Sequence, residues 1–161
     1  MRPSLLLPLA ALLACFPAPR QSSGNAATTA TPPAAPATAK LRRLAWLEGR
    51  WRGSEDEGAP FYESYQVVSD YLIEGHTYTD STFRTAKDTS LIQLQGDEIV
   101  TSSNAVAVEL DSTSVRFEAR GGTSGYTWTR VDPDRWNAVI TWTNAKGEPQ
   151  RKTYFMSRVA P

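Results

Sequence analysis

Cysteine and histidine are nearly absent from this chain, which limits the kinds of functional site it can form. The 161 residues include one cysteine, Cys15, and one histidine, His76. A single cysteine excludes an internal disulfide framework and a cysteine-rich zinc site, while a single histidine excludes a multi-histidine metal cluster. No glycine-rich phosphate loop or nucleophile elbow is present in the sequence either. The sequence therefore predicts no metal and no cofactor.

An excess of charge of one sign is also missing. The 17 Lys and Arg residues balance 17 Asp and Glu residues. Residues 1–39 contain two of the basic residues, Arg2 and Arg20, and no acid, which leaves 15 basic and 17 acidic residues in residues 40–161. Nucleic-acid binding requires a concentrated basic face, so a mildly acidic domain of mixed charge argues against a nucleic-acid partner.

The chain has no apolar run of the ~20 residues that a membrane-spanning helix needs. Its main apolar run, residues 4–14, follows the basic start Met1-Arg2-Pro3 and gives residues 1–14 the layout of a signal peptide. The run ends in Leu12-Leu13-Ala14-Cys15, which resembles a bacterial lipobox, where the cysteine thiol is joined to diacylglycerol. The resemblance implies that Cys15 is the lipid attachment site. The alternative is an ordinary secretory signal that is cleaved nearby, with Cys15 incidental.

The segment 15–39 is rich in alanine, proline, serine and threonine and carries almost no charge. A segment of this composition cannot bury enough apolar surface to fold, so we expect a disordered tether between the lipid and the folded domain. Phe16 follows the cysteine in place of the aspartate that resembles an inner-membrane retention signal. By this resemblance, the expected location is the bacterial cell envelope, lipid-anchored at the outer membrane and facing the periplasm.

Helical periodicity is nearly absent from residues 40–161, apart from one or two turns at residues 42–48. After Gly49, apolar and polar residues alternate with a period of two, and β-branched and aromatic residues are enriched. The candidate strands are residues 50–55, 62–68, 71–79, 90–95, 98–102, 105–110, 115–120, 126–131, 136–143 and 151–159. Their hairpin-length connections leave no room for helical crossovers, so the sheet is predicted to be antiparallel. We expect an all-β, up-and-down barrel of roughly 8–10 strands with a short N-terminal helical turn, the alternative being a sandwich.

The segment from Leu44 to Gly53 carries the most specific signature of the chain. Its sequence, Leu-Ala-Trp-Leu-Glu-Gly-Arg-Trp-Arg-Gly, resembles the start of lipocalin-like barrels, where a helical turn leads into Gly-x-Trp on the first strand. More narrowly, it resembles small bacterial lipocalin-like domains of unassigned activity that begin with Leu-x-x-Leu-x-Gly-x-Trp-x-Gly. The resemblance implies that Trp51 plugs the closed end of the barrel, with Arg158 or Arg151 lying across its ring in a cation–π contact.

A barrel interior is the default ligand site, because a small closed barrel can hold one small molecule. The candidate ligand-binding residues are Tyr65, His76, Tyr78, Trp128, Trp142 and Tyr154. The alternative is that such aromatic side chains fill a solid core. The alternation does not determine which face of residues 136–143 points inward, since Val139 is apolar on the face opposite Trp142.

Glu63, Glu74 and His76 are the candidate catalytic residues. Glu74 and His76 share one face of the strand predicted at residues 71–79, and Glu63 lies on the preceding strand. If these faces point inward, Glu63 or Glu74 would orient the imidazole of His76 for general acid–base catalysis near neutral pH. The alternative is that His76 is a solvated or otherwise satisfied strand residue.

Three hypotheses about function follow from these patterns. The leading one is an envelope lipoprotein whose lipocalin-like barrel binds a small apolar or amphiphilic ligand. The alternatives are a non-catalytic envelope interaction module and a small-molecule isomerase or hydrolase that uses a Glu–His pair. These hypotheses are best distinguished by whether the side chains of Glu63, His76 and Trp142 point into a cavity.

Overall fold

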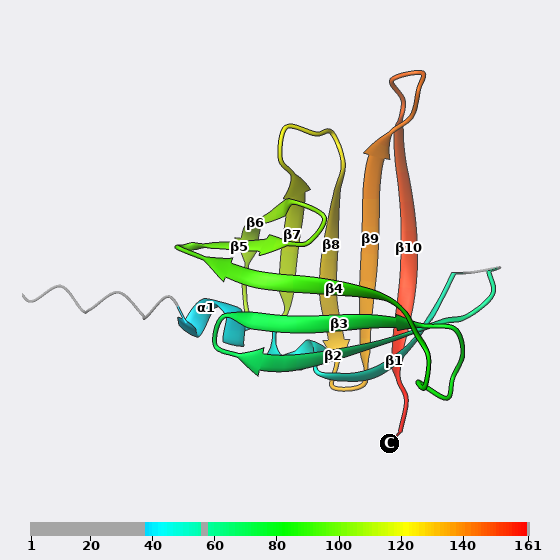
Figure 1. The fold of residues 1–161 in the computed structure, drawn as a ribbon. Coiled ribbons are helices and arrows are strands. Elements are labelled where there is room, and N and C mark those ends of the chain that lie inside the picture. The colour runs from blue at the N-terminus through cyan, green and yellow to red at the C-terminus, as the bar shows by residue number, and fades with distance from the viewer. Residues whose placement is uncertain (1–37, 56–57, 161) are drawn as a thin grey trace, which may run out of the picture. The chain divides into compact units, whose positions relative to one another are not determined.

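Ten antiparallel strands form a closed barrel in the computed structural model of the protein (Figure 1). The structure describes residues 38–55 and 58–160. The strands are β1 (Gly49–Ser54), β2 (Phe61–Ser69), β3 (Leu72–Tyr78), β4 (Ala86–Gln95), β5 (Glu98–Thr101), β6 (Ala105–Leu110), β7 (Ser114–Ala119), β8 (Gly125–Asp132), β9 (Arg135–Thr143) and β10 (Pro149–Arg158). Each strand pairs with its neighbours in sequence, and β1 pairs with β10 to close the barrel. The predicted all-β, antiparallel, up-and-down barrel is confirmed, and a sandwich is excluded.

The predicted strand boundaries agree with the observed ones to within one or two residues, except at β4. This strand begins at Ala86 rather than at the predicted residue 90. Alanine, lysine and aspartate are weak strand formers, so their local propensity does not predict a strand there. In the barrel, however, Asp88 and Thr89 pair with Thr77 and His76 of β3. Cross-strand pairing therefore extends β4 beyond its local propensity.

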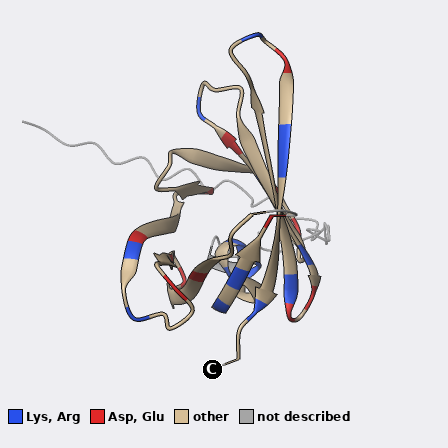
Figure 2. Ribbon diagram, turned by 90° about the vertical axis from the view of Figure 1, so that its right-hand side faces the viewer, with Lys and Arg blue, Asp and Glu red and all other residues tan. Residues whose placement is uncertain are grey.

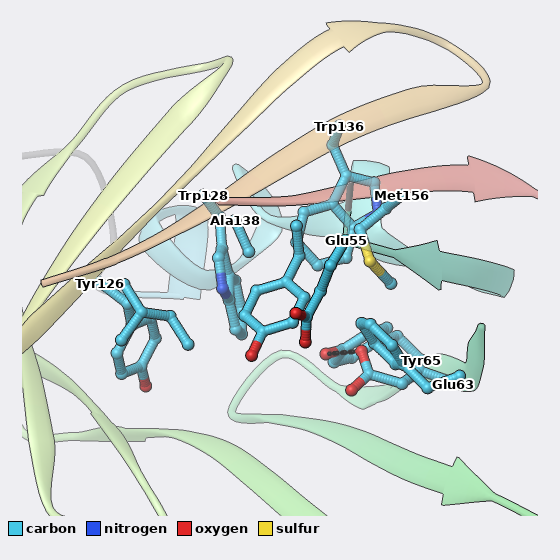
Figure 3. A pocket seen from close by; sticks show the side chains of 11 residues that line it. Glu55, Glu63, Tyr65, Tyr126, Trp128, Trp136, Ala138 and Met156 are labelled. Carbon is cyan, nitrogen blue, oxygen red and sulfur yellow. Dashed lines mark hydrogen bonds between the residues drawn. The ribbon is translucent and has the colours of Figure 1, made fainter. Parts of the chain in front are cut away.

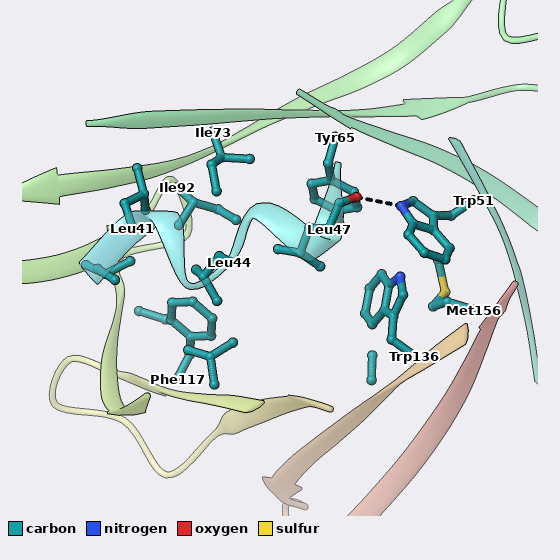
Figure 4. Close-up of a cluster of buried hydrophobic side chains, with 14 of the residues drawn as sticks. Leu41, Leu44, Leu47, Trp51, Tyr65, Ile73, Ile92, Phe117, Trp136 and Met156 are labelled. Carbon is teal, nitrogen blue, oxygen red and sulfur yellow. Dashed lines mark hydrogen bonds between the residues drawn. The ribbon is translucent and has the colours of Figure 1, made fainter. Parts of the chain in front are cut away.

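A short helical segment before β1 fills one end of the barrel interior. It consists of α1 (Thr38–Arg42) and the 3-10 helix η1 (Ala45–Leu47). Leu41, Leu44 and Leu47 are fully buried, and Figure 4 shows them among core residues of β3, β4 and β7. The helical turn expected near residues 42–48 is thus present and contributes three leucines to the core. None of the described helices is long and apolar enough to cross a membrane.

Trp51 on β1 lies beside this segment and closes the same end of the barrel. Its ring is buried, and its indole Nε1 donates a hydrogen bond to the Leu47 carbonyl oxygen at 2.6 Å (Figure 4). The Arg158 guanidinium carbon lies 4.2 Å from the centroid of the Trp51 ring. Arg158 also donates hydrogen bonds to the carbonyl oxygens of Glu48, at 2.9 Å, and Pro133, at 3.1 Å. The cation–π contact expected from the sequence is therefore present, and Arg158 is the partner.

Strand alternation explains why Arg158 rather than Arg151 occupies this position. The two residues are an odd number of positions apart on β10, so their side chains point to opposite faces of the strand. Arg151 is exposed and lies opposite Thr141 of β9. Gly49 makes room for Arg158, because a Cβ at this residue would lie 2.2 Å from Arg158 Nη1 and its φ of +130° disfavours other residues.

Burial alternates along the strands and identifies their inward faces. Val115 and Phe117 of β7 are buried, as are Trp136 and Ala138 of β9. The inward face of residues 136–143 is therefore the one that carries Trp136, which the sequence left open. Val139 lies on the opposite, outer face of β9.

The exposed side of the barrel carries charges of both signs. Figure 2 shows basic and acidic segments interspersed along the described strands and loops. Some of these charges form ion pairs, such as Arg116 of β7 with Glu109 of β6 at 2.8 Å and Arg120, just after β7, with Glu98 of β5 at 2.6 Å. This mixed distribution differs from the basic face that nucleic-acid binding requires.

The predicted signal peptide, residues 1–14, lies outside the described residues, as does Cys15. The same holds for the predicted tether up to residue 37. The last two residues of that predicted tether belong to α1, so the described helical segment begins slightly before the expected domain start at residue 40.

Candidate ligand-binding cavity

A cavity of about 460 Å³ lies inside the barrel, beyond the Trp51 plug. Six aromatic residues line it: Phe61, Tyr65, Tyr126, Trp128, Trp136 and Tyr154. Ala138, Ile140 and Met156 add aliphatic surface, and Glu55 and Glu63 are the charged lining residues. Figure 3 shows these side chains converging from strands at the start, middle and end of the chain. The interior is thus a mainly apolar pocket with few polar groups, as small-molecule sites commonly are.

Ring-to-ring contacts hold the wall of the cavity in place. The ring centroid of Trp128 lies 5.6 Å from that of Trp136, in a tilted geometry, and 6.0 Å from that of Tyr65, in an edge-to-face geometry. Phe61 meets Tyr154 edge-on at 5.4 Å. Each such pair contributes about 0.5–1.5 kcal/mol beyond its burial and restricts the rotation of both rings. The cavity wall is therefore preorganised.

Trp136 connects the cavity to the barrel plug. Its ring lines the cavity and also packs edge-on against Trp51 at 6.0 Å and Trp46 at 6.0 Å. Its indole N–H is buried and has no hydrogen-bond acceptor among the described residues.

Glu63 is the half-buried carboxyl group of the cavity that has no basic partner among the described residues. The β1–β2 and β2–β3 registers place it opposite Trp51 and Thr77, on the inward face of β2. The Tyr65 hydroxyl donates a hydrogen bond to Glu63 Oε2 at 2.9 Å. Burial raises the pKa of Glu63, and the hydrogen bond from Tyr65 opposes part of that rise. The pKa of Tyr65 is raised well above its usual value, by burial first and by the Glu63 charge second.

Gly75 allows the Tyr65 ring to take this position. The two residues face each other across β2 and β3, and a Cβ at Gly75 would lie 2.9 Å from Tyr65 Cε1. Such a separation is shorter than a normal carbon–carbon contact. Gly75 therefore gives the Tyr65 ring the space from which its hydroxyl reaches Glu63.

The second carboxylate, Glu55, is neutralised by a neighbouring base. Lys152 Nζ lies 2.6 Å from Glu55 Oε1, and also 5.1 Å from the centroid of the Tyr154 ring. The pair is partly exposed to solvent, and Glu55 raises the pKa of Lys152. No ion pair formed by the described residues includes Glu63. The two carboxylates of the cavity thus differ in their charge environment.

His76 and Glu74 do not face the cavity. His76 lies opposite Ser64 in the β2–β3 register, whereas the inward-facing Glu63 lies opposite Thr77. His76 Nε2 is 3.4 Å from Glu74 Oε1, and His76 Nδ1 is 3.1 Å from Thr89 Oγ1, on the outer face. The condition for a Glu63–His76 pair in one cavity is not met, because the two residues occupy opposite faces of neighbouring strands, and His76 is the satisfied strand residue of the alternative. The acid–base pair that required this meeting is not formed.

Two of the predicted ligand-binding aromatic residues also lie outside the cavity. Tyr78 shares the outer face with His76, where its hydroxyl is 3.0 Å from Ser64 Oγ and its ring packs against Phe83. Trp142 lies on the inward face of β9, beyond Ile140, and is 37% exposed. In contrast, three of the predicted ligand-binding residues do line the cavity: Tyr65, Trp128 and Tyr154.

The list of candidate residues omitted several that line the cavity. Phe61 is the clearest case, since it lies opposite Gly53 and its ring covers that residue, where a Cβ would be 2.1 Å from Phe61 Cζ. The Gly53 of the opening motif was therefore a signal that a large ring packs across it. Tyr126, Trp136 and Met156 were also omitted, although alternation places them on the same strand faces as the predicted Trp128, Trp142 and Tyr154. Within the described ranges, no group of three or more His, Cys, Asp and Glu residues could hold a metal ion.

No family model matches this chain, and no curated protein sequence matches it. Seventeen chains of solved structures resemble it, including the following three. EF1p2_mFAP2b bound to DFHBI is 12% identical, with a TM-score of 0.39, over 74% of this chain and 99% of that chain. Rv2717c from M. tuberculosis is 14% identical, with a TM-score of 0.44, over 78% and 99% of the two chains. A redesigned beta barrel, b11L5F_LGL, is 12% identical, with a TM-score of 0.34, over 74% and 96%. At these identities and TM-scores, no ligand or activity follows for this chain.

Proposed function

We propose that the barrel binds one small, apolar or amphiphilic molecule in its interior, as a lipocalin-like binding protein. The observation that carries this proposal is the cavity of about 460 Å³ with six aromatic residues in its wall. Its volume falls within the range of roughly 300–1,000 Å³ that is usual for small-molecule sites.

The test is to fill the cavity from one position. Ala138 lines the cavity, so Ala138→Trp places an indole in the space that a ligand needs. We expect binding of the neutral fluorescent probe N-phenyl-1-naphthylamine to weaken by about tenfold or more. The second readout is native mass spectrometry of protein purified from a bacterial envelope, where a co-purifying small molecule is expected with the natural protein and not with the variant.

The matched control for this variant is Thr129→Trp. Thr129 is exposed on β8, where an added indole leaves the cavity unchanged, so probe binding should persist. Ala138→Leu adds less volume and serves where Ala138→Trp does not fold, since overpacking costs stability. Unchanged probe binding in a folded Ala138→Trp protein would show that the cavity is not the binding site.

We also propose that the protein is a lipoprotein of the bacterial envelope, anchored through Cys15 at the outer membrane and facing the periplasm. The support comes from the sequence: the signal-like residues 1–14, the sequence Leu12-Leu13-Ala14-Cys15 and the low-charge segment that follows. A tether of this length would place the barrel near the membrane, where apolar and amphiphilic molecules are concentrated.

A further inference from the structure

The charge inside the cavity is unbalanced. Glu55 is paired with Lys152 at 2.6 Å, whereas the polar contact of Glu63 is the hydrogen bond from Tyr65. The residues that line the cavity include no lysine, arginine or histidine. An ionised Glu63 is therefore a negative charge in an apolar interior without a basic partner among the described residues.

An unpaired buried carboxylate is costly, since burial removes its hydration without supplying a counter-ion. The Tyr65 hydrogen bond supplies one donor, but a carboxylate has two oxygens and accepts several hydrogen bonds. A ligand that brings a positive charge and N–H donors would complete this coordination. A neutral hydrocarbon would instead remove the remaining water and leave the charge unsatisfied.

The rings around Glu63 favour the same kind of ligand. Tyr65, Trp128 and Trp136 line the cavity with it, and the faces of tyrosine and tryptophan rings attract cations. Such rings give an anion no comparable attraction, and Glu63 would repel it. The described wall thus combines the two features that protein sites use to hold organic cations.

We propose that the natural ligand is an organic cation, an ammonium group carried on an aromatic or apolar body, with the Glu63 carboxylate as its counter-ion. The inference rests on the binding function proposed above and specifies its ligand class. The apolar body lies against the rings of the cavity, and the ammonium group donates a hydrogen bond to Glu63.

The experiment compares three probes that share a naphthalene body and differ in charge: 2-naphthylmethylamine, 2-naphthylmethanol and 2-naphthoate. Affinities are measured at pH 8 by calorimetry and by quenching of tryptophan fluorescence. The amine is expected to bind about tenfold or more tightly than the alcohol, and the carboxylate more weakly than either. An alcohol that binds as tightly as the amine would overturn the cation proposal while leaving cavity binding intact.

The matched variants are Glu63→Gln and Glu74→Gln. Glu63→Gln keeps the size of the side chain and removes its charge, so the preference for the amine over the alcohol should disappear. Glu74→Gln makes the same change on the outer face of β3, away from the cavity, and the preference should persist. A preference that survives in a folded Glu63→Gln protein would contradict the proposal. Failure of all three probes to bind the natural protein would contradict the proposed function itself, and the cation inference with it.

A pH profile of the natural protein tests the proposal without any variant. The amine stays protonated below pH 8, so a loss of its preference on acidification reports a group of the protein. The charged or titratable groups that share the inward side with Glu63 are Glu55, Tyr65, Asp88, Tyr126, Arg130, Lys152, Tyr154 and Arg158. Of the two arginines, Arg158 lies over the Trp51 ring and Arg130 donates a hydrogen bond to the Asp132 carbonyl oxygen. Burial raises the pKa of Glu63, and the preference should fall as pH drops through that raised pKa. A preference that is constant down to pH 4 would overturn the assignment of Glu63.

Discussion

At the scale of single residues, Glu63 is proposed to strengthen ligand binding while its charged form destabilises the folded protein. Its carboxyl group is half-buried among aromatic rings, and its protein partner is the Tyr65 hydroxyl. Burial disfavours the charged form, so the pKa in the folded protein lies above that of the unfolded chain. The energetic cost is therefore present above the raised pKa and absent below the unfolded pKa.

Because the charged form of Glu63 destabilises the fold above its raised pKa, we predict that Glu63→Gln stabilises the protein at neutral and alkaline pH. The variant removes the buried charge and keeps an oxygen acceptor for the Tyr65 hydroxyl. We expect its melting temperature at pH 8 to exceed that of the natural protein by roughly 3–6 °C, which corresponds to about 1 kcal/mol for a domain of this size. The difference should shrink as pH falls toward 4. Thermal unfolding followed by circular dichroism measures it, and equal melting temperatures at pH 8 would contradict the prediction.

Some of the predicted ligand-binding residues lie in the cavity wall, although their role in binding stays a prediction. Trp128 and Tyr154 are large aromatic residues on late strands, and both line the cavity. His76 was misplaced because the direction of a strand residue depends on register, which local sequence does not encode. A shift of one position in the β2–β3 pairing would have brought His76 onto the side where Glu63 lies.

At the scale of elements, the helical segment and β1 act together to close one end of the barrel. Leu44 has 0% exposure between α1 and η1, and Leu47 accepts the hydrogen bond from Trp51. The opening motif predicted this arrangement well, because its glycine, tryptophan and leucine spacing is specific. The start of β4 was less predictable, because its first residues are strand only by virtue of their partners on β3.

Replacing one buried leucine of this segment should destabilise the folded protein strongly. Leu44→Ala is expected to lower the free energy of unfolding by about 2–5 kcal/mol, as large-to-small substitutions in a core do. Arg43→Ala is the control, since Arg43 is exposed and should change the stability by less than about 0.5 kcal/mol. Urea denaturation gives both values. Similar small effects for the two variants would show that the segment does not support the barrel.

At the scale of the whole molecule, the proposed lipid anchor assigns the cysteine a role separate from the barrel. Cys15→Ser should abolish incorporation of an alkyne-labelled fatty acid in a bacterial host and release the protein from the membrane fraction. Its purified barrel should retain the melting temperature of the natural protein, because the described fold begins at Thr38. Continued lipid labelling of the variant would contradict the assignment of Cys15.

The seam between β1 and β10 has a consequence for the order of folding. It joins the first and last strands of the barrel, with Arg158 Nη1 bonded to the Glu48 carbonyl oxygen 110 positions away and Ser157 Oγ to that of Arg52, 105 positions away. Hairpins between consecutive strands can form early, since they close short loops, whereas contacts of this separation carry a large entropic cost and form late. A nascent chain that lacks β10 therefore has two open sheet edges, which leaves it prone to edge-to-edge association until the final strand is complete.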